Sequence, residues 1–301
     1  MQLVLFDNHT PGLLKGDSVV DVTAAVRDVA GRNGQETMEA IIENFERLRP
    51  ALERELRDGP ALPLSAVRLR APLPRPGKIM MMGANYLEGT SGPALPIWGF
   101  LKSPEAVLDP GGTCVLPKAE ARVFHHEAEL AVVIGRRGKD ISQEHALEHV
   151  FGYMVGVDVS GRFADMPNSL VGKSYDTFSP FGPAITTADE IADPHQLQVR
   201  LSVSGEPRQD YNTSDMGHRI PECIEYWSAI TTINPGDVLF CGTNHQGLGA
   251  LQDDDRVEMT IDGLGTLTFT ISDPLERVWP RGLDPAIGQT VRERILSGHG
   301  F

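Results

Sequence analysis

The chain has 301 residues, of which 41% are hydrophobic and 23% charged, a composition that excludes a disordered or fibrous protein and allows one large domain with a small one. With 27 Lys and Arg against 41 Asp and Glu, the net charge of −14 opposes binding to nucleic acids and anionic membranes, and no basic patch offsets it. No apolar run approaches the roughly 18–20 residues of a membrane span. We therefore expect a cytoplasmic protein without nucleic-acid or membrane partners.

The first 72 residues are predicted to form a small α+β domain. Short apolar runs near the N-terminus precede a helical stretch that starts at about Glu36. Its apolar residues recur at i, i+3 and i+4 spacing, and they are Met38, Ile41, Ile42, Phe45 and Leu48. Five prolines lie between Gly59 and Lys78, a density that prevents a regular helix and suits an extended connector. We place the domain boundary there, with domains at 1–72 and 73–301.

From Lys78 onward, short apolar segments separated by turn residues predict a mostly β domain. The predicted strands are Ile79–Met82, Thr113–Leu116, Glu129–Ile134, Phe151–Val157, Leu197–Val203, Val238–Cys241, Val257–Ile261 and Thr266–Ile271. Ser204-Gly205 and Asp262-Gly263 predict hairpin turns. Two helices are expected, at Ser142–His149 with Ser142 as the N-cap and at Pro221–Ile230 with proline in the first turn. The predicted fold class is α+β, mostly β.

The segment that follows His126 carries two glutamates in a strand-like run. Side chains at i and i+2 project from the same face of a strand, so Glu127 and Glu129 are expected to lie side by side. Apolar residues then continue on both faces, which indicates a buried strand, where adjacent carboxylates repel each other. A hard divalent cation such as Mg²⁺ or Mn²⁺ would compensate them. A solvated strand face would also accommodate the pair.

A third carboxylate, Asp158, ends the apolar run Gly152–Val157 and stands near Arg162. A lone acidic residue at the end of a buried strand is typical of a functional rim.

Five motifs, in order, resemble the fumarylacetoacetate hydrolase family. They are Glu127-x-Glu129, Val157–Arg162, Gly172–Pro183, Asn212–Met216 and Pro235–Thr243. The resemblance implies a mixed β-roll fold, usually a homodimer, and Mg²⁺ or Mn²⁺ held by Glu127, Glu129 and Asp158. It also implies a small anionic substrate that binds the cation through a 2-oxo-carboxylate end, so that the cation stabilises an enolate.

The resemblance also assigns roles to single residues. Lys173 matches the family's active-site lysine, which places a positive charge beside the developing oxyanion. Thr243 matches a threonine expected to hydrogen-bond the substrate carboxylate. Without the resemblance, Lys173 would be interpreted as a surface lysine and Thr243 as a turn residue. Further substrate-binding candidates are Arg162, Lys102 and Tyr86. Alternatively, Arg162 pairs with a carboxylate of the metal site or forms a surface ion pair.

One feature of the family is missing. Its hydrolytic members carry a His and a Glu, three residues apart, shortly after an Asn-Tyr pair. Here Asn85 and Tyr86 are kept, but Gly89 and Gly92 stand at the positions of the dyad. Because glycine has no titratable group, activation of water needs a base from elsewhere. Glu88, next to these glycines, is a candidate substitute.

A second departure is the loop Gly242–Gly249, which is one residue longer than the family's loop and introduces His245. Because imidazole titrates near neutral pH, His245 is a candidate catalytic acid or base, with an exposed loop histidine as the alternative. His125 and His126 are weaker candidates, for which packing or a bond to a metal ligand is the simpler role. The Asn212–Met216 segment is interpreted as a cap of the following helix.

These features favour metal-dependent hydrolysis of a C–C bond in a small acylpyruvate or β-diketo acid. The alternative is a lyase or isomerase of the same fold, acting as a decarboxylase, dehydratase or tautomerase on a 2-oxo acid. Such an enzyme needs the metal but no activated water, and the two glycines favour it. The third hypothesis is a binding protein without catalytic activity. The retention of the three carboxylates opposes this hypothesis.

Overall fold

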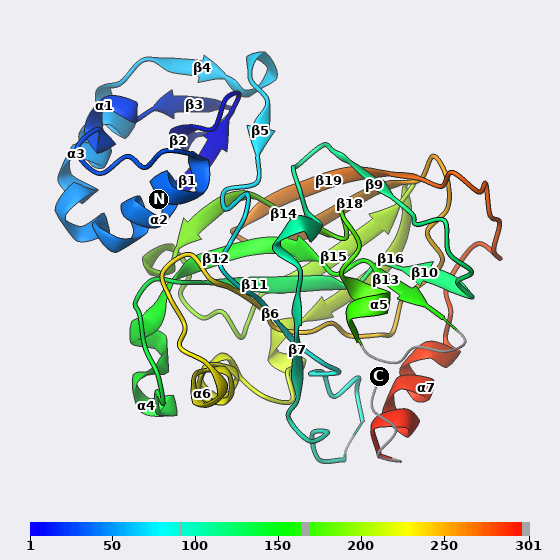
Figure 1. The fold of residues 1–301 in the computed structure, drawn as a ribbon. Coiled ribbons are helices and arrows are strands. Elements are labelled where there is room, and N and C mark those ends of the chain that lie inside the picture. Colours follow the sequence, from blue (N-terminus) through cyan, green and yellow to red (C-terminus); the bar gives the residue numbers. More distant parts are fainter. Residues whose placement is uncertain (91, 164–168, 297–301) are drawn as a thin grey trace.

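A computed structural model describes residues 1–90, 92–163 and 169–296 of the chain. Two sheets, a short two-stranded ribbon and few helices make up the described part (Figure 1). The α+β, mostly β class expected from the sequence is confirmed. None of the helices in the described ranges is long and apolar enough to cross a membrane.

The largest sheet has twelve strands, in the order β4-β3-β2-β1-β14-β12-β11-β17-β6-β7, with β5 paired to β1 and β8 paired to β14. These strands are β1 (Gln2–Phe6), β2 (Thr10–Lys15), β3 (Ser18–Asp21), β4 (Ala61–Pro63), β5 (Leu69–Arg70), β6 (Ile79–Met82), β7 (Gly99–Lys102), β8 (Val107–Leu108), β11 (Ala128–Ile134), β12 (Val150–Val157), β14 (Ser179–Thr187) and β17 (Val238–Phe240).

The second sheet has five strands, in the order β16-β15-β18-β19-β9, and β10 pairs with β13 in a separate ribbon. The bounds are β9 (Thr113–Val115), β10 (Val123–His125), β13 (Ser160–Arg162), β15 (Gln198–Val203), β16 (Glu206–Asn212), β18 (Arg256–Ile261) and β19 (Gly265–Ser272). The two predicted hairpin turns join β15 to β16 and β18 to β19. Ser204 and Gly205 both have positive φ, as a tight hairpin turn requires.

The α-helices lie mainly at the periphery (Figure 1). They are α1 (Thr23–Val26), α2 (Gly34–Glu43), α3 (Phe45–Asp58), α4 (Gln143–Ala146), α5 (Ser169–Lys173), α6 (Ile220–Ile230) and α7 (Ala286–Leu296). Helix α2 begins at an Asn33 cap, whose side chain accepts from the amide of Glu36. The single helical stretch expected from Glu36 onward is therefore two helices, which meet at Asn44.

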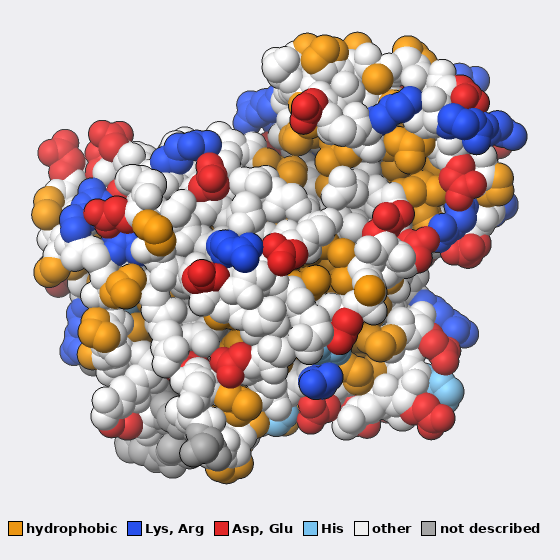
Figure 2. Space-filling model, turned by 180° about the vertical axis from the view of Figure 1, so that it is seen from behind, with side chains coloured by type: hydrophobic (Ala, Val, Ile, Leu, Met, Phe, Trp, Pro, Cys, Tyr) orange, Lys and Arg blue, Asp and Glu red, His pale blue; other side chains and the backbone are white. Residues whose placement is uncertain are grey.

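Strands β1–β5 and helices α1–α3, called the N-terminal unit below, stand out from the main body (Figure 1). Hydrophobic side chains show on this unit and where it joins the rest of the molecule (Figure 2). The unit is nevertheless continuous with the main sheet, because β1 pairs antiparallel with β14 through Gln2–Thr186 and Leu3–Ile185. Its apolar residues share one buried cluster with residues of β6, β11, β12, β14 and β17.

Strand β11 lies at the centre of the large sheet, between β12 and β17, and all seven of its residues are buried. Its even-numbered apolar residues face the core between the two sheets, and its odd-numbered apolar residues face the N-terminal unit. Just before β11, the carbonyl of Glu127 accepts from the amide of Asp158, 2.8 Å away. This bond holds the residue after β12 opposite Glu127.

Two local predictions need correction. The helix expected at Ser142–His149 is α4 followed by a 3₁₀ turn at Leu147–His149, and the side chain of Ser142 makes no capping bond. Asn212 does not cap α6: it caps the 3₁₀ turn Thr213–Asp215, because its side chain accepts from the amide of Ser214. At the start of helix α6, the amide of Arg219 instead donates a capping bond to Oε2 of Glu222 at 2.8 Å.

Candidate active site

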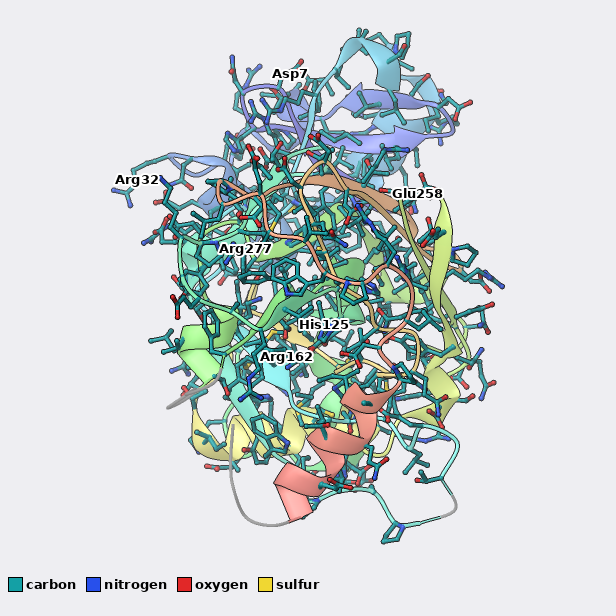
Figure 3. The ribbon with its side chains drawn as sticks, turned by 90° about the vertical axis from the view of Figure 1, so that its right-hand side faces the viewer. Asp7, Arg32, His125, Arg162, Glu258 and Arg277 are labelled. Atoms are coloured by element: carbon teal, nitrogen blue, oxygen red, sulfur yellow. The ribbon has the colours of Figure 1, made fainter. Side chains whose placement is uncertain are left out.

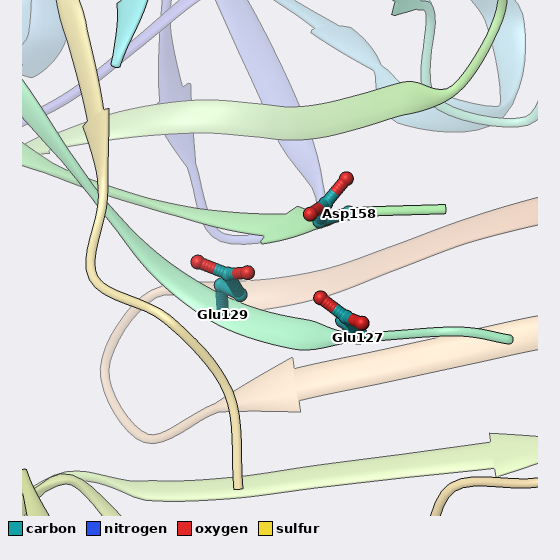
Figure 4. A group of neighbouring side chains, drawn as sticks. All are labelled: Glu127, Glu129 and Asp158. Atoms are coloured by element: carbon teal, nitrogen blue, oxygen red, sulfur yellow. The ribbon is translucent and has the colours of Figure 1, made fainter. Parts of the chain in front are cut away.

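Three buried carboxylates meet where β11 and β12 lie side by side. Glu127 and Glu129 project from the beginning of β11 toward Asp158, which directly follows β12 (Figure 4). One oxygen from each carboxylate lies within 4.8 Å of the others, and each residue is at most 5% exposed. An all-oxygen donor set of this kind fits a hard divalent cation such as Mg²⁺ or Mn²⁺. The buried alternative for the Glu127 and Glu129 pair therefore holds, and the solvated strand face does not.

Cations surround two of the three carboxylates. Nζ of Lys173 lies 2.6 Å from Glu127 and 2.7 Å from Asp158, and so bridges them. Nη2 of Arg162 lies 2.5 Å from the second oxygen of Glu127. Nζ of Lys102 lies 2.6 Å from the second oxygen of Asp158. Although burial opposes ionisation, Lys173 and Arg162 hold the pKa of Glu127 well below its usual range.

Among the described residues, no Lys or Arg forms an ion pair with Glu129. Its carboxylate accepts from the amide of Gly242, 2.6 Å away. Burial, with repulsion from Asp158 and Glu127, raises the pKa of Glu129 well above its usual range. A divalent cation bound by the three carboxylates would supply the compensation that this residue lacks, so the donor set and its charge balance both fit a metal.

A histidine and a glutamate from distant segments pair beside the carboxylates. Nδ1 of His245 lies 2.5 Å from Oε1 of Glu88, and the amide of His245 donates to the same oxygen at 2.9 Å. Both side chains are largely buried, at 6% exposure for His245 and 15% for Glu88. A carboxylate held against Nδ1 orients the ring and leaves Nε2 as the other nitrogen for proton transfer. The structure thus brings together two residues that the sequence suggested separately.

Two further polar residues, which the sequence analysis missed, fix the loops of this pair. Oδ2 of Asp215 accepts from the amide of Glu88 at 2.9 Å and from Nδ2 of Asn244 at 3.1 Å. Nε2 of Gln209 donates to the hydroxyl of Thr243 at 2.8 Å and to the carbonyl of Asn244 at 2.7 Å. Asp215 lay in a segment interpreted only as a cap, and Gln209 lay in a polar strand, so neither carried a functional signal in sequence.

A hollow lies in front of the carboxylates. The hollow measures about 390 Å³ with the open space before it, and the centre of a water molecule can occupy about 20 Å³ of it, room for an ion or a water molecule. Six of the predicted site residues line it, namely Glu127, Asp158, Arg162, Lys173, Thr243 and His245. Met82, Trp98 and Phe100 add an apolar wall that the sequence did not predict. Trp98 and Phe100 are stacked, with ring centroids 5.8 Å apart.

Other predicted residues lie behind this surface. Lys102 is fully buried beneath Asp158 and also donates to the carbonyl of Phe178 at 2.7 Å. The ring of Tyr86 packs edge-on against Tyr211, away from the residues that line the hollow. The hydroxyl of Thr243, within the lining, donates to the carbonyl of Ala128 at 2.8 Å. Direct substrate contacts by Lys102 and Tyr86 stay predictions.

His125 and His126 support the site from outside the hollow. Nε of Arg162 donates to Nδ1 of His125 at 3.3 Å, so this ring helps to hold the guanidinium that contacts Glu127; Figure 3 shows His125 and Arg162 close together. Burial, together with the charge of Arg162, lowers the pKa of His125 to about 2. Burial lowers the pKa of His126 to about 4, and Gln209 contacts its ring at 3.0 Å. Both rings are neutral at physiological pH, as a packing role requires.

The model of the fumarylacetoacetate (FAA) hydrolase C-terminal family matches residues 79–272, which contain all three carboxylates. The chain belongs to the fumarylacetoacetate hydrolase family. The resemblance in the sequence motifs is thereby confirmed, and with it the identification of the protein as an enzyme of this family.

Similar members of the fumarylacetoacetate hydrolase family catalyse more than one type of reaction. The chain is 32% identical to a maleylpyruvate hydrolase of Aquipseudomonas alcaligenes over 288 residues, which cover 90% of this chain and 99% of the relative. It is 37% identical to a human mitochondrial oxaloacetate tautomerase over 234 residues, which cover 73% of each. A crystal structure of a Sphingobium maleylpyruvate hydrolase in complex with manganese(II) and pyruvate has a TM-score of 0.82 and 36% identity, over 91% of this chain and 99% of that one.

Proposed function

We propose that this enzyme binds Mn²⁺ or Mg²⁺ through Glu127, Glu129 and Asp158 and hydrolyses a C–C bond in a small acylpyruvate or β-diketo acid. The observation that carries the proposal is that Glu127 and Asp158 of the buried three-carboxylate set line the same hollow as His245, whose ring is hydrogen-bonded to Glu88. A bound divalent cation supplies a positive charge that polarises the 2-oxo carbonyl and stabilises negative charge on its oxygen. The maleylpyruvate hydrolase that binds manganese and pyruvate supports this choice of cation and substrate class.

The charges of the site suit an anionic substrate. The cations Lys102, Lys173 and Arg162 balance three ionised carboxylates, so a divalent cation leaves an excess of positive charge in a buried space. A 2-oxo acid brings the negative charge that neutralises this excess. We assign Lys173 to the oxygen on which charge develops, because its ammonium lines the hollow and touches two metal-binding residues.

The remaining substrate-binding roles follow the positions of the side chains. Arg162 and Thr243 line the hollow and are assigned to the substrate carboxylate, for which the Thr243 hydroxyl must turn its proton away from the carbonyl of Ala128. Lys102 is assigned to the positioning of Asp158, and Tyr86 to the packing behind the site, although a direct contact with substrate was expected from the sequence. The stacked Trp98 and Phe100 are suited to the unsaturated or apolar part of the acid.

The His245–Glu88 pair supplies the base that hydrolysis requires in this proposal. Glu88 holds the ring of His245, which takes a proton from water as the water oxygen attacks the distal carbonyl carbon. The C–C bond then breaks, and its electron pair stays with the pyruvate half, which His245 reprotonates. Tautomerisation of a 2-oxo acid is the second candidate, because the similar tautomerase belongs to the same family and His245 would move a proton in that reaction too.

Product analysis tests the proposal. An acylpyruvate and oxaloacetate are incubated separately with the protein and Mn²⁺ in water labelled with ¹⁸O. Cleavage products are identified by mass spectrometry, and tautomerisation of oxaloacetate is followed by the ultraviolet absorbance of its enol. Hydrolysis places one ¹⁸O in the acid released from the acyl half, whereas tautomerisation releases no such acid. The proposal of hydrolysis fails if no acylpyruvate is cleaved while oxaloacetate is tautomerised, and an absence of both reactions with metal bound contradicts the assigned substrate class.

Three broader expectations from the sequence belong to the same proposal. A homodimer, as the family resemblance implies, predicts a mass near twice 32.8 kDa by light scattering. A cytoplasmic location is checked by fractionation of cells. Two domains, 1–72 and 73–301, predict proteolytic cleavage in the proline-rich connector, although the β1–β14 pairing ties the two parts together.

A further inference from the structure

The chain after β19 runs alongside the loop that carries His245 and is hydrogen-bonded to it. We call residues 279–288 the strap. The family match ends at residue 272, so the strap lies outside the matched region. Trp279 and Gln252 exchange two hydrogen bonds, from the Gln252 amide group to the Trp279 carbonyl at 3.0 Å and from the Trp279 amide to Oε1 of Gln252 at 3.3 Å.

The contacts continue step by step toward the catalytic pair. Nη1 of Arg281 lies 2.6 Å from Oδ1 of the buried Asp255. The amide of Asp284 donates to the carbonyl of Leu248 at 2.7 Å, and the amide of Leu248 donates to the carbonyl of His245 at 3.2 Å. The strap is therefore fixed to the loop by backbone and side-chain bonds along its length, rather than by one contact.

The strap reaches the His245–Glu88 pair at Gly288, in the first turn of α7. A Cβ atom at position 288 would lie 2.8 Å from Oε2 of Glu88 and 3.4 Å from Cβ of His245. The first distance is too short for a carbon and an oxygen in contact, so any side chain there would displace the carboxylate of Glu88. The end of a glutamate side chain moves at little cost in stability, but this carboxylate holds the imidazole of His245 at 2.5 Å.

We propose that the strap is a positioning element for the His245–Glu88 pair, and that the missing side chain at Gly288 sets the place of the Glu88 carboxylate. This inference rests on the proposed catalytic role of the pair and adds a residue far from it in sequence. The strap contributes no reacting group. The absence of a side chain at Gly288 leaves room for Oε2 of Glu88, while Oε1 of the same carboxylate contacts the amide and Nδ1 of His245.

The proposal is tested with Gly288→Ala, with Gln289→Ala as the matched control on the exposed face of the same helix. Alanine favours a helix more than glycine does, so Gly288→Ala is not expected to lower the melting temperature. The proposal predicts that it lowers kcat by roughly ten- to a hundredfold, because small misplacements of catalytic groups are costly. KM and Mn²⁺ affinity stay unchanged, and Gln289→Ala stays within about twofold of wild type.

A second pair of variants separates positioning from packing. Glu88→Asp shortens the side chain and removes the atom that the new methyl group would meet. In the Glu88→Asp background, Gly288→Ala should change kcat by less than about threefold. Effects of Gly288→Ala that differ in this way between the two backgrounds indicate a contact between positions 88 and 288. Equal losses in both backgrounds, or no loss in either, would overturn the proposal.

The ring resonances of His245 provide a readout that does not need turnover. In histidine-labelled protein, with the signal assigned by His245→Gln, Gly288→Ala should shift these resonances and Gln289→Ala should not. If the wild type converts no substrate but the resonances shift in this way, the proposed reaction fails and the strap proposal stands. If they do not shift, the strap proposal fails whatever the activity.

Discussion

Nδ1 of His245 lies 2.5 Å from Oε1 of Glu88, although 157 positions separate the two residues in the chain. The motif resemblance leads us to expect the His and Glu of a hydrolytic member in one short segment, where this chain has Gly89 and Gly92. The enzyme therefore has a histidine–carboxylate pair whose histidine comes from the loop after β17 and whose glutamate comes from the loop after β6. We therefore propose His245 as the base in place of the residues expected at Gly89 and Gly92.

Replacement of either member of the pair should remove most of the turnover. We expect His245→Gln and Glu88→Gln each to lower kcat by about 10²- to 10⁴-fold, the range typical of general base catalysis. Mn²⁺ affinity should change little, because neither residue belongs to the carboxylate set. Steady-state kinetics and metal titration check both points, with the exposed His145→Gln as the control. Full activity of His245→Gln would show that another base serves.

Substitution of Glu129 should abolish metal binding with little change in shape. Glu129→Gln keeps the volume but removes the charge of the carboxylate whose pKa is raised by burial and by its acidic neighbours. In the wild type, Mn²⁺ at 100 times its Kd should add about 2.7 kcal/mol to the free energy of unfolding. The variant should gain almost nothing, whereas the exposed Glu258→Gln should behave like wild type. Equal stabilisation of Glu129→Gln in thermal unfolding would contradict the site.

Removal of the buried ammonium of Lys102 should destabilise the protein more without metal than with it. Lys102→Met leaves Oδ1 of Asp158 without its cation, and breaking a buried ion pair costs about 3–5 kcal/mol. Added Mn²⁺ should recover part of this loss, since it supplies positive charge to the same carboxylate. Urea unfolding with and without Mn²⁺ measures the effect, and the exposed Lys139→Met is the control. A loss that metal does not reduce would separate Asp158 from the metal site.

The stability of the fold should decrease in mild acid partly through His195. Its Nε2 accepts from the amide of Ile220 at the start of α6, which requires a neutral ring. Burial, with repulsion from Arg219, lowers the pKa of His195 below 6.5. The unfolded chain therefore takes up the proton first, so the free energy of unfolding falls as the pH drops below 6.5, by less than about 1.4 kcal/mol per pH unit.

Chemical denaturation at pH 7.5 and pH 5.5 isolates the contribution of His195. The difference in unfolding free energy between the two pH values should be smaller in His195→Gln than in wild type. An identical pH dependence in both proteins would mean that the pKa of His195 is the same in the folded and the unfolded chain.

The metal-binding candidates were predictable because they depend on local periodicity. The i, i+2 spacing of Glu127 and Glu129 and the place of Asp158 at the end of an apolar run are properties of single strands. The sequence of the two segments does not give the register between β11 and β12. That register brings Asp158 opposite Glu127. The distribution of Lys102, Lys173 and Arg162 over the carboxylate oxygens also depends on packing between segments.

Other parts carried weak signals. Strand β14 contains Pro180 and Pro183, which oppose a strand assignment, yet it joins the N-terminal unit to the main sheet. Strand β16 carries Gln209, but its polar sequence lacks the apolar alternation that predicts a strand. The role of Gly288 has no sequence signal at all, because it depends on which side chains lie opposite a missing Cβ.

The measurement that tests the central claim most directly is deuterium incorporation at the carbon next to the carbonyl of a 2-oxo acid, followed by mass spectrometry in D₂O. The account predicts fast exchange with wild-type protein and Mn²⁺ or Mg²⁺, and background exchange after chelation of the metal or with Glu129→Gln. Exchange that is equally fast in Glu129→Gln, or that persists without a divalent cation, would contradict a metal site built from Glu127, Glu129 and Asp158.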